Sequence, residues 1–161
     1  MAKYVLENHR RSRDEELVTI AENRSCSVDA IQELLGCTIG KGNLVLLDYG
    51  KQAFTVYSRE GSSALRIYFR GENIEGMDRL RRPQGDGEDP EALRQAIISR
   101  ILSAPDDEVL SVREVTTPAP ESARIYPSIR CQECGESFTE ILGRTAGGRI
   151  LCKDCFKRLV C

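Results

Sequence analysis

The sequence has no tryptophan, a single histidine and few aromatic residues, which make up 6% of its 161 residues. The one histidine, His9, lies in a polar stretch, and we expect it to be a solvated side chain. No Ser-His-Asp triad and no pair of catalytic carboxylates can be assembled from the rest of the chain. The sequence therefore leaves an enzymatic activity open and favours a non-catalytic accessory protein or subunit.

Long apolar runs and an excess of one charge are also missing. No apolar run approaches the roughly 20 residues of a membrane span, and the N-terminus lacks the longer apolar core of a secretory signal. The 23 basic and 25 acidic residues give a formal net charge of -2, which creates no field that gathers polyanions. We therefore expect a cytoplasmic protein that binds neither membranes nor nucleic acid.

Four of the seven cysteines form two CxxC pairs, Cys131/Cys134 and Cys152/Cys155, which are separated by 17 residues. This spacing is typical of four-cysteine zinc sites, and a reducing cytosol works against disulfides. A disulfide pair or a redox-active CxxC is the alternative. A filled shell of four thiolates leaves no position for water, so the sequence predicts one structural zinc ion.

The segment that carries these cysteines is small. About 33 residues bury too little apolar surface to fold alone and usually need a metal or disulfides. The positive charges of its basic residues and of the zinc ion equal the negative charges of its acidic residues and thiolates. The segment therefore has no net charge, which argues against nucleic-acid binding. We expect a miniature core around the metal, formed by Phe138, Ile141, Leu142, Ile150, Leu151, Phe156 and Leu159.

A proline-rich connection precedes the cysteine segment. Pro118, Pro120 and Pro127 make it stiff and extended rather than part of a core. The sequence therefore predicts an α+β domain over 1–116, a linker over 117–128 and a small zinc-ribbon domain over 129–161.

The larger domain alternates apolar runs with turn signals. Ser25 is expected to cap a helix that ends at Gly36, and Asp89 to cap a second helix before Ala104, with Leu93, Ile97, Ile101 and Leu102 on its apolar face. Three consecutive strands after the first helix predict an antiparallel face. The expected strands are 17–22, 44–49, 53–57, 64–69 and 109–115, with an exposed loop over 71–90.

Two further cysteines flank the first predicted helix. Cys26 lies at its N-terminus, where the helix dipole favours a thiolate or a metal ligand. Cys37 lies some 16 Å further along at 1.5 Å per residue, so the two cannot easily share one ion within a protomer. Composition alone favours buried, inert cysteines at both positions.

The glycine-rich segment from Gly36 to Asn43 is not a P-loop. It has one residue too few between its glycines, and no Ser or Thr follows Lys41. A tight turn between helix and strand is favoured over a backbone concavity for an anion.

Long motifs carry a resemblance to a known family. They are Asp14-Glu-Glu-Leu-Val, Glu22-Asn-Arg-Ser-Cys26-Ser-Val-Asp29, Gly36-Cys-Thr-Ile-Gly40-Lys-Gly-Asn43, Asp48-Tyr-Gly-Lys51, Arg100-Ile-Leu-Ser-Ala-Pro105 and the CxxC pairs. In these motifs the sequence resembles the FmdE/FwdE family, which is named after one of the subunits of formylmethanofuran dehydrogenase.

The resemblance implies an FwdE-like α+β domain with a mixed sheet and packed helices, a homodimer, and a C-terminal DksA/TraR-like zinc ribbon. It also implies a metal-binding pocket lined by Cys26, Cys37 and Lys51, and association with a molybdenum or tungsten oxidoreductase or another protein partner. Family members usually begin with a segment of the type His-Gly-His-x-Cys-Pro-Gly, which this sequence does not show. The implied second metal site would therefore be incomplete, completed by a dimer partner, or lost.

Two functions follow from these observations. The first is a metal-binding accessory protein related to the FmdE component of molybdenum or tungsten formylmethanofuran dehydrogenase, with a structural zinc ribbon. The second is a zinc-finger module that regulates or binds a partner protein without catalytic activity.

Overall fold

The chain divides into two compact units, residues Met1–Ser122 and Ala123–Cys161, and each is described by itself. None of the described helices is both long and apolar enough to cross a membrane. The computed structural model describes residues 5, 17–59, 64–77, 89–116 and 118–160.

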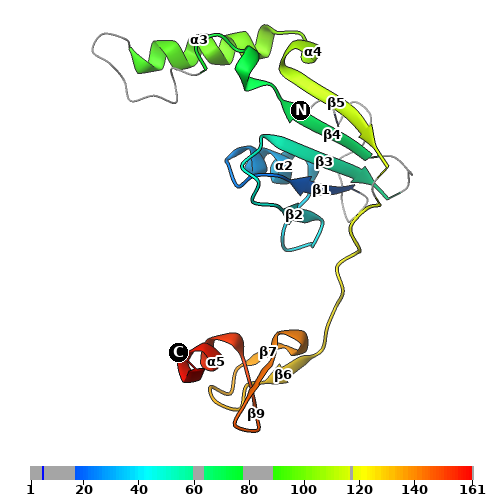
Figure 1. The fold of residues 1–161 in the computed structure, drawn as a ribbon, viewed down its shortest axis with the longest axis vertical. Helices are drawn as coiled ribbons and strands as arrows, with labels where there is room; N and C mark the ends of the chain where they lie inside the picture. The colour runs from blue at the N-terminus through cyan, green and yellow to red at the C-terminus, as the bar shows by residue number, and fades with distance from the viewer. Residues whose placement is uncertain (1–4, 6–16, 60–63, 78–88, 117, 161) are drawn as a thin grey trace. The chain divides into compact units, whose positions relative to one another are not determined.

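The N-terminal unit is built on a five-stranded mixed sheet with strand order β2-β1-β3-β4-β5 (Figure 1). β1 pairs with β2 in parallel, and the other neighbours are antiparallel. This arrangement confirms the predicted α+β class with a mixed sheet. The strands are β1 (Leu17–Ala21), β2 (Leu44–Leu46), β3 (Ala53–Ser58), β4 (Ala64–Phe69) and β5 (Leu110–Val115).

The predicted antiparallel face is correct for β3 and β4 but wrong for β2. β2 pairs with β1, in the register Thr19 opposite Leu44, and not with β3. The reason is helix α2 (Ser27–Leu35), which connects β1 to β2 and gives the crossover that a parallel pair requires. The hairpin from β3 to β4 forms as predicted, with Phe54 opposite Ile67.

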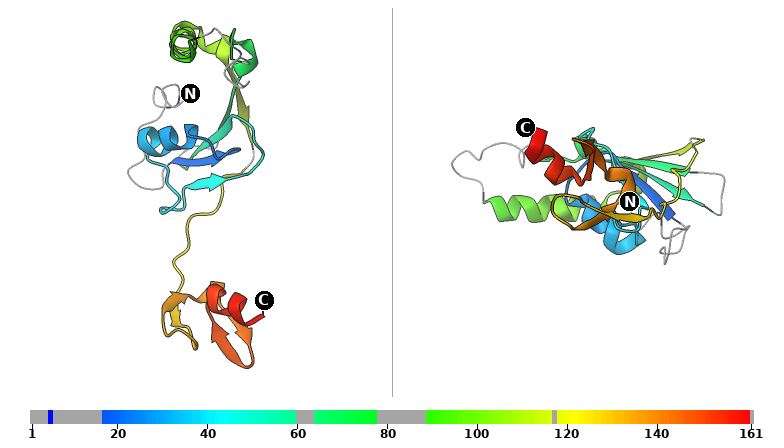
Figure 2. Two further views of the ribbon diagram at one scale, coloured as in Figure 1. Left: turned by 90° about the vertical axis from the view of Figure 1, so that its left-hand side faces the viewer. Right: turned by 90° about the horizontal axis from the view of Figure 1, so that it is seen from below.

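One face of the sheet packs against α2, as the side view in Figure 2 shows. Alternate residues of the strands point to this face, as strand geometry requires. The apolar stripe of α2 meets them and forms the main core of the unit. The buried side chains of this cluster include Val28, Ile31 and Leu35 of α2 and Leu17, Ala21, Leu44, Phe54, Val56 and Ile67 of the sheet.

The ends of α2 differ from the prediction at one point. Gly36 ends the helix with a φ of 72°, the left-handed conformation that glycine favours, as predicted. At the other end Cys26 is the N-cap residue, and no side chain caps the helix. The predicted cap by Ser25 is wrong, because the Ser25 hydroxyl donates to Asn23 Oδ1 at 2.8 Å instead.

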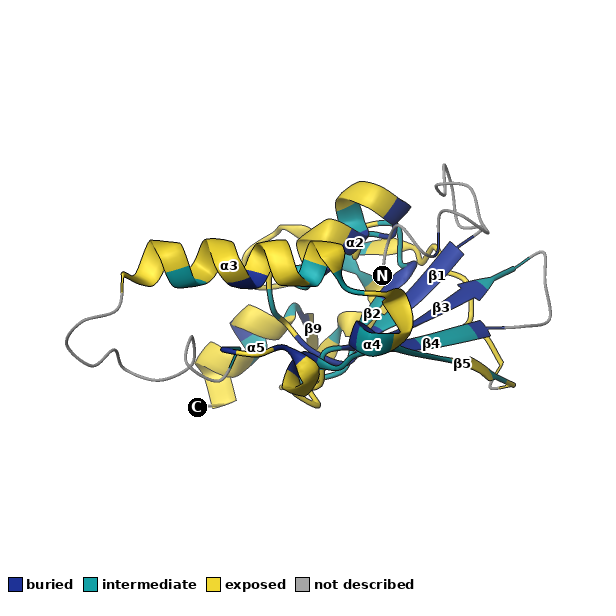
Figure 3. Cartoon of the chain, turned by 90° about the horizontal axis from the view of Figure 1, so that it is seen from above, coloured by how far each residue is buried: buried dark blue, intermediate teal, exposed yellow. Residues whose placement is uncertain are grey.

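Helix α3 (Pro90–Ser103) contacts the unit along a narrow stripe. Its predicted cap is confirmed, since Asp89 Oδ1 accepts from the Glu91 amide at 3.0 Å. Ile97 is buried, but most of the helix is exposed and yellow in Figure 3. The expectation that Leu102 lies on the apolar face is wrong, because it is 81% exposed. Leu102 lies five positions after Ile97, a rotation of about 140° around the helix axis, so its side chain points away from the contact stripe.

Two short helical turns lie near β5, one after β4 and one directly before β5. A 3₁₀ turn, η1 (Gly71–Asn73), begins the segment that was expected to be a loop, and residues 78–88 of that segment lie outside the described residues. The one-turn helix α4 (Asp106–Val109) precedes β5 and was not predicted. Asn73 Nδ2 donates to the Glu108 carbonyl at 2.8 Å and ties the two turns together.

The other face of the sheet carries an ion pair that spans β3. Arg66 in β4 donates through Nε and Nη2 to the two carboxylate oxygens of Glu22, at 2.7 and 2.9 Å. The side chains are only 11% (Glu22) and 19% (Arg66) exposed. The hydrogen bond from Arg66 lowers the pKa of Glu22 in spite of partial burial. Loss of either partner would leave a polar group half-buried without its main contact.

The C-terminal unit has two short hairpins and one helix, visible around β6, β7, β9 and α5 in Figure 1. β6 pairs with β7, and β8 with β9, both antiparallel. Strands of three residues bury little apolar surface, so the described part of this unit has only a small apolar core. Its elements are β6 (Ser128–Arg130), β7 (Ser137–Thr139), η3 (Glu140–Leu142), β8 (Arg144–Ala146), β9 (Arg149–Leu151) and α5 (Lys153–Val160).

We predict that Ile97→Ala lowers the free energy of unfolding of the N-terminal unit by about 2–4 kcal/mol, because it leaves a cavity under α3. Leu102→Ala, in the same helix but exposed, should change it by no more than about 0.5 kcal/mol. Urea unfolding followed by circular dichroism measures both. Equal effects of the two substitutions would contradict the packing described for α3.

We predict that Glu22→Gln costs about 1–3 kcal/mol at pH 7, because the Arg66 guanidinium loses its carboxylate. The folded-state pKa of Glu22 lies below its ordinary value of 4.5, so the contribution is present above about pH 4.5 and is lost as the pH falls through the folded-state pKa. Urea unfolding from pH 7 to pH 3 should show the two proteins converging.

The control for this experiment is Asp48→Asn. Asp48 pairs with Arg24 at 3.6 Å, and these side chains are 74% and 65% exposed. An exposed pair of this kind contributes less than about 1 kcal/mol. A difference between wild type and Glu22→Gln that stays constant down to pH 3 would contradict the role given to the Glu22 carboxylate.

Candidate metal centre

The structure brings the four predicted cysteines together. The Sγ atoms of Cys131, Cys134, Cys152 and Cys155 all lie within 4.8 Å of one another. Cys131 and Cys155 are buried, Cys152 is half-buried and Cys134 is exposed. Among the described residues, this is the one group of three or more His, Cys, Asp or Glu side chains whose ligand atoms converge in this way. Four cysteines are thus positioned to bind a metal ion.

The sulfur spacing fits a tetrahedral ion. A zinc ion with sulfur ligands at about 2.3 Å requires neighbouring sulfurs roughly 3.8 Å apart. Mutual separations of no more than 4.8 Å need only a small contraction to reach this geometry. Thiolate sulfur is also the ligand that zinc and other soft ions prefer.

The first CxxC pair forms a tight turn between β6 and β7. The Cys131 amide donates to the Glu136 carbonyl at 2.9 Å, and the Gly135 amide donates to the Cys131 carbonyl at 3.0 Å. Gly135 has a φ of 76°, a conformation that costs other residues energy. Gly135 therefore closes the turn that points both sulfurs of the pair to one side.

The second pair lies where β9 passes into α5. Cys152 directly follows β9, and Cys155 lies in the first turn of the helix. The Cys152 amide donates to Cys131 Sγ at 3.3 Å, which links the two pairs. This backbone hydrogen bond lowers the pKa of Cys131 to about 6. The backbone donor therefore favours the thiolate form of Cys131, which is the form that binds a metal.

The thiols of Cys134 and Cys155 resist ionisation when no cation is near. Burial, together with the neighbouring cysteines, raises the pKa of Cys155 to about 12. Sulfurs that are crowded in this way cannot all become anions unless a positive charge compensates them. A divalent cation at their centre supplies that charge, and its binding would release protons.

Few apolar side chains surround the sulfurs. Leu151 is fully buried, and Phe138 and Phe156 pack against it and the buried cysteines. The predicted miniature core is correct for these three residues. It is wrong for the other four, which lie in η3, β9 and α5 with their side chains exposed to solvent. The exposed members are Ile141, Leu142, Ile150 and Leu159.

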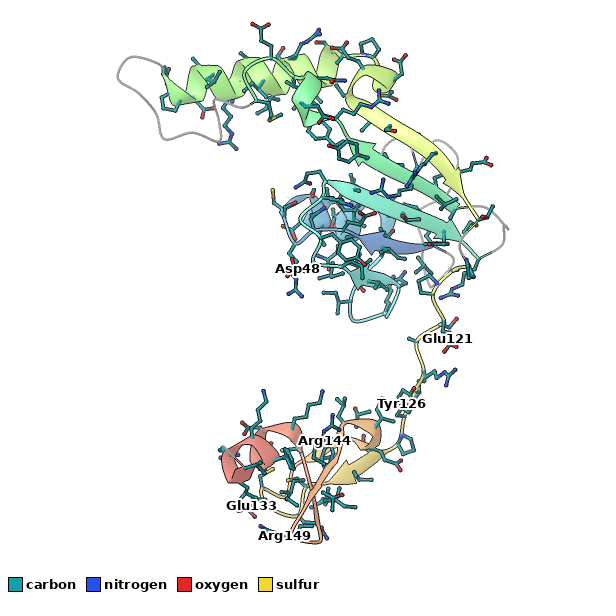
Figure 4. All side chains as sticks on the ribbon, viewed as in Figure 1. Asp48, Glu121, Tyr126, Glu133, Arg144 and Arg149 are labelled. Atoms are coloured by element: carbon teal, nitrogen blue, oxygen red, sulfur yellow. The ribbon has the colours of Figure 1, made fainter. Side chains whose placement is uncertain are left out.

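Charged side chains lie around the metal centre in ion pairs that were not predicted from the sequence. Arg149 forms an ion pair with Glu133, and both are labelled in Figure 4. In α5, Arg158 Nη2 lies 2.8 Å from Asp154 Oδ2 and 3.3 Å from Cys155 Sγ. The signal for the second contact is in the sequence, since residues three apart on a helix are neighbours and Arg158 follows Cys155 by three.

The three residues implied for an N-terminal pocket occupy different places. Cys26 is exposed at the N-terminal end of α2, and Cys37 is buried beyond its C-terminal end. Lys51 is exposed, and its carbonyl accepts from Asn23 Nδ2 at 2.8 Å, which holds it near the segment that leads into α2. The expectation that both cysteines are buried is therefore wrong for Cys26. His9 lies outside the described residues.

Hydrogen bonds hold Cys37 in the core. Thr19 Oγ1 donates to Cys37 Sγ at 3.3 Å, and the thiol donates to the Leu17 carbonyl at 3.5 Å. Burial raises the pKa of Cys37, which keeps the thiol neutral.

The adjacent glycine-rich segment forms the tight turn that was favoured. The Lys41 ammonium donates to the Gly36 carbonyl at 3.2 Å, and the Asn43 side chain accepts from the Thr38 amide at 2.8 Å. Lys41 thus binds the C-terminal end of α2, where a positive charge is favourable.

Comparison with solved structures finds proteins of similar fold. A crystal structure of an FmdE-like protein from Syntrophus aciditrophicus, described as similar to a component of tungsten formylmethanofuran dehydrogenase, superposes with a TM-score of 0.62. The match covers 97% of this chain and 78% of that one, at 21% sequence identity. The two chains therefore share a fold.

Comparison with known sequences identifies relatives. A curated protein of Archaeoglobus fulgidus, named "Probable S-adenosyl-L-methionine-binding protein", is 30% identical over 135 residues, which is 76% of this chain. The match spans only 37% of the relative's own length. A family profile described as "FmdE, Molybdenum formylmethanofuran dehydrogenase operon" matches residues 1–111. With its profile matched over more than half of the sequence, the chain belongs to the FmdE family.

Proposed function

We propose that the chain is a metal-binding accessory protein related to the FmdE component of formylmethanofuran dehydrogenase, and that its four clustered cysteines hold one structural zinc ion. The observation that carries the proposal is the convergence of the four sulfurs within 4.8 Å in a unit of about 39 residues. With all four positions taken by thiolates, the ion has no site for water or substrate. The ion would therefore stabilise the unit and take no part in a reaction.

The choice of zinc rests on ligand chemistry. Four thiolates select zinc or iron–sulfur chemistry among the common ions, and two CxxC pairs in one small unit are typical of structural zinc. The small apolar cluster around Leu151 is too limited to hold the unit together alone. Metal binding would supply the missing folding free energy.

The accessory role rests on the family. Membership of the FmdE family supports association with a dehydrogenase complex, and the relative from Syntrophus is described as an FmdE-like protein. We further propose that the chain acts as a homodimer in the cytoplasm. The comparisons give no support to the regulatory alternative.

The second metal in the N-terminal unit stays a prediction. Cys26 and Cys37 lie at opposite ends of α2, so one ion could bind both only with the help of another chain. Cys37 Sγ also already contacts Thr19 and Leu17. We therefore expect the clustered cysteines to account for the metal that a monomer retains.

We predict about one zinc ion per chain in protein purified without chelators, measured by inductively coupled plasma mass spectrometry. Cys155→Ser should lose this zinc, because it removes one of the four ligands. Cys26→Ser, the control, should retain it. Protein with no zinc, or with iron in its place, would contradict the proposed site, and two metals per wild-type chain would establish the second one.

We predict that removing the metal with a chelator unfolds the C-terminal unit and leaves the N-terminal unit folded. The physical reason is that the two units have separate cores, one apolar and one built on sulfur. Amide hydrogen exchange should show lost protection in β6 to α5 and unchanged protection in β1 and β3. Unchanged protection in the C-terminal unit would argue against a structural role for the ion.

A further inference from the structure

The guanidinium of Arg158 lies beside one of the four metal-binding sulfurs. Its Nη2 atom is 3.3 Å from Cys155 Sγ, within hydrogen-bond distance for a sulfur acceptor. The same atom is 2.8 Å from Asp154 Oδ2, four residues earlier in α5. Asp154 thus helps to hold the guanidinium in place on the helix surface, next to the sulfur.

The guanidinium of Arg158 is positively charged, and the metal centre beside it carries negative charge. Four thiolates and a divalent ion carry a net charge of −2, so the bound sulfurs remain electron-rich. A cationic donor stabilises such a sulfur more than a neutral donor does. Cys155 itself is 2% exposed, and a neighbouring guanidinium reduces the availability of its lone pairs further.

We propose that Arg158 protects the metal centre by donating a hydrogen bond to the metal-bound thiolate of Cys155, which lowers the nucleophilicity of that sulfur and slows loss of the ion. The proposal rests on the metal site proposed above. Arg158 acts through Cys155 and is not itself a ligand. Its role differs from that of a surface charge, because it depends on contact with one sulfur.

The chain offers a matched control in the preceding residue. Lys157 has the same charge, lies in the same helix and is exposed. Residues one apart on a helix point in directions about 100° apart. Lys157→Gln therefore changes the net charge of the unit as Arg158→Gln does, while the Arg158 contact with sulfur stays in place.

The test uses full-length, zinc-loaded protein and iodoacetamide. The Cys155 sulfur forms a bond to the acetamide carbon, and iodide leaves with the electron pair. Mass spectrometry of peptides follows the alkylation of Cys155, and a chromophoric chelator follows zinc release in parallel. Because Arg158 is exposed, Arg158→Gln should fold and bind one zinc per chain.

We expect Arg158→Gln to speed both reactions about fivefold, the factor that corresponds to one typical hydrogen bond. Lys157→Gln should stay within about twofold of wild type, and Arg158→Lys, which keeps a cationic donor, should fall between wild type and Arg158→Gln. Equal rates for Arg158→Gln and wild type would overturn the proposal, as would an equal acceleration by Lys157→Gln.

The zinc content and the reaction rate together distinguish a failure of this inference from a failure of the proposed function. If wild-type protein holds no zinc, the metal site itself is wrong. If Arg158→Gln holds a full complement of zinc and reacts at the wild-type rate, the metal site stands and the role of Arg158 is wrong.

Discussion

The C-terminal unit depends on one constraint, which is that four sulfur atoms occupy a space of a few ångströms. Its buried cluster consists of two of these cysteines and Leu151, with two phenylalanines packed against it. Burial and the neighbouring cysteines raise the pKa of Cys155, so the crowded thiols do not all ionise by themselves. A bound cation attracts the thiolates and so offsets the electrostatic cost of bringing them together. The two hairpins and α5 are arranged around the four sulfurs.

The N-terminal unit is stabilised in a different way. Apolar side chains of the sheet and of α2 form its largest buried cluster, and no metal is needed to explain its packing. The opposite face of the sheet carries the ion pair of Glu22 and Arg66 across β3. The unit therefore presents one apolar face to its helices and a partly polar face on the other side.

Cys26 and Cys37, which the family resemblance places in one pocket, lie in different environments in the structure. Motif spacing puts Cys26 and Cys37 at the two ends of a helix, and that much is local geometry. Their environments are opposite, since one sulfur is exposed and the other is bonded to Thr19 inside the core. These two environments give the thiols different chemistry, although each cysteine flanks the same helix.

The sequence by itself determined what local chemistry controls. The two CxxC pairs, the glycine that ends α2, the Asp89 cap and the hairpin of β3 and β4 each depend on residues that are close in the chain. The partner of β2, the exposure of Leu102 and the ion pair between Arg66 and Glu22 were decided by the tertiary structure. The physical reason is that pairing, burial and side-chain contact depend on which segments pack together, and local propensity does not encode that choice.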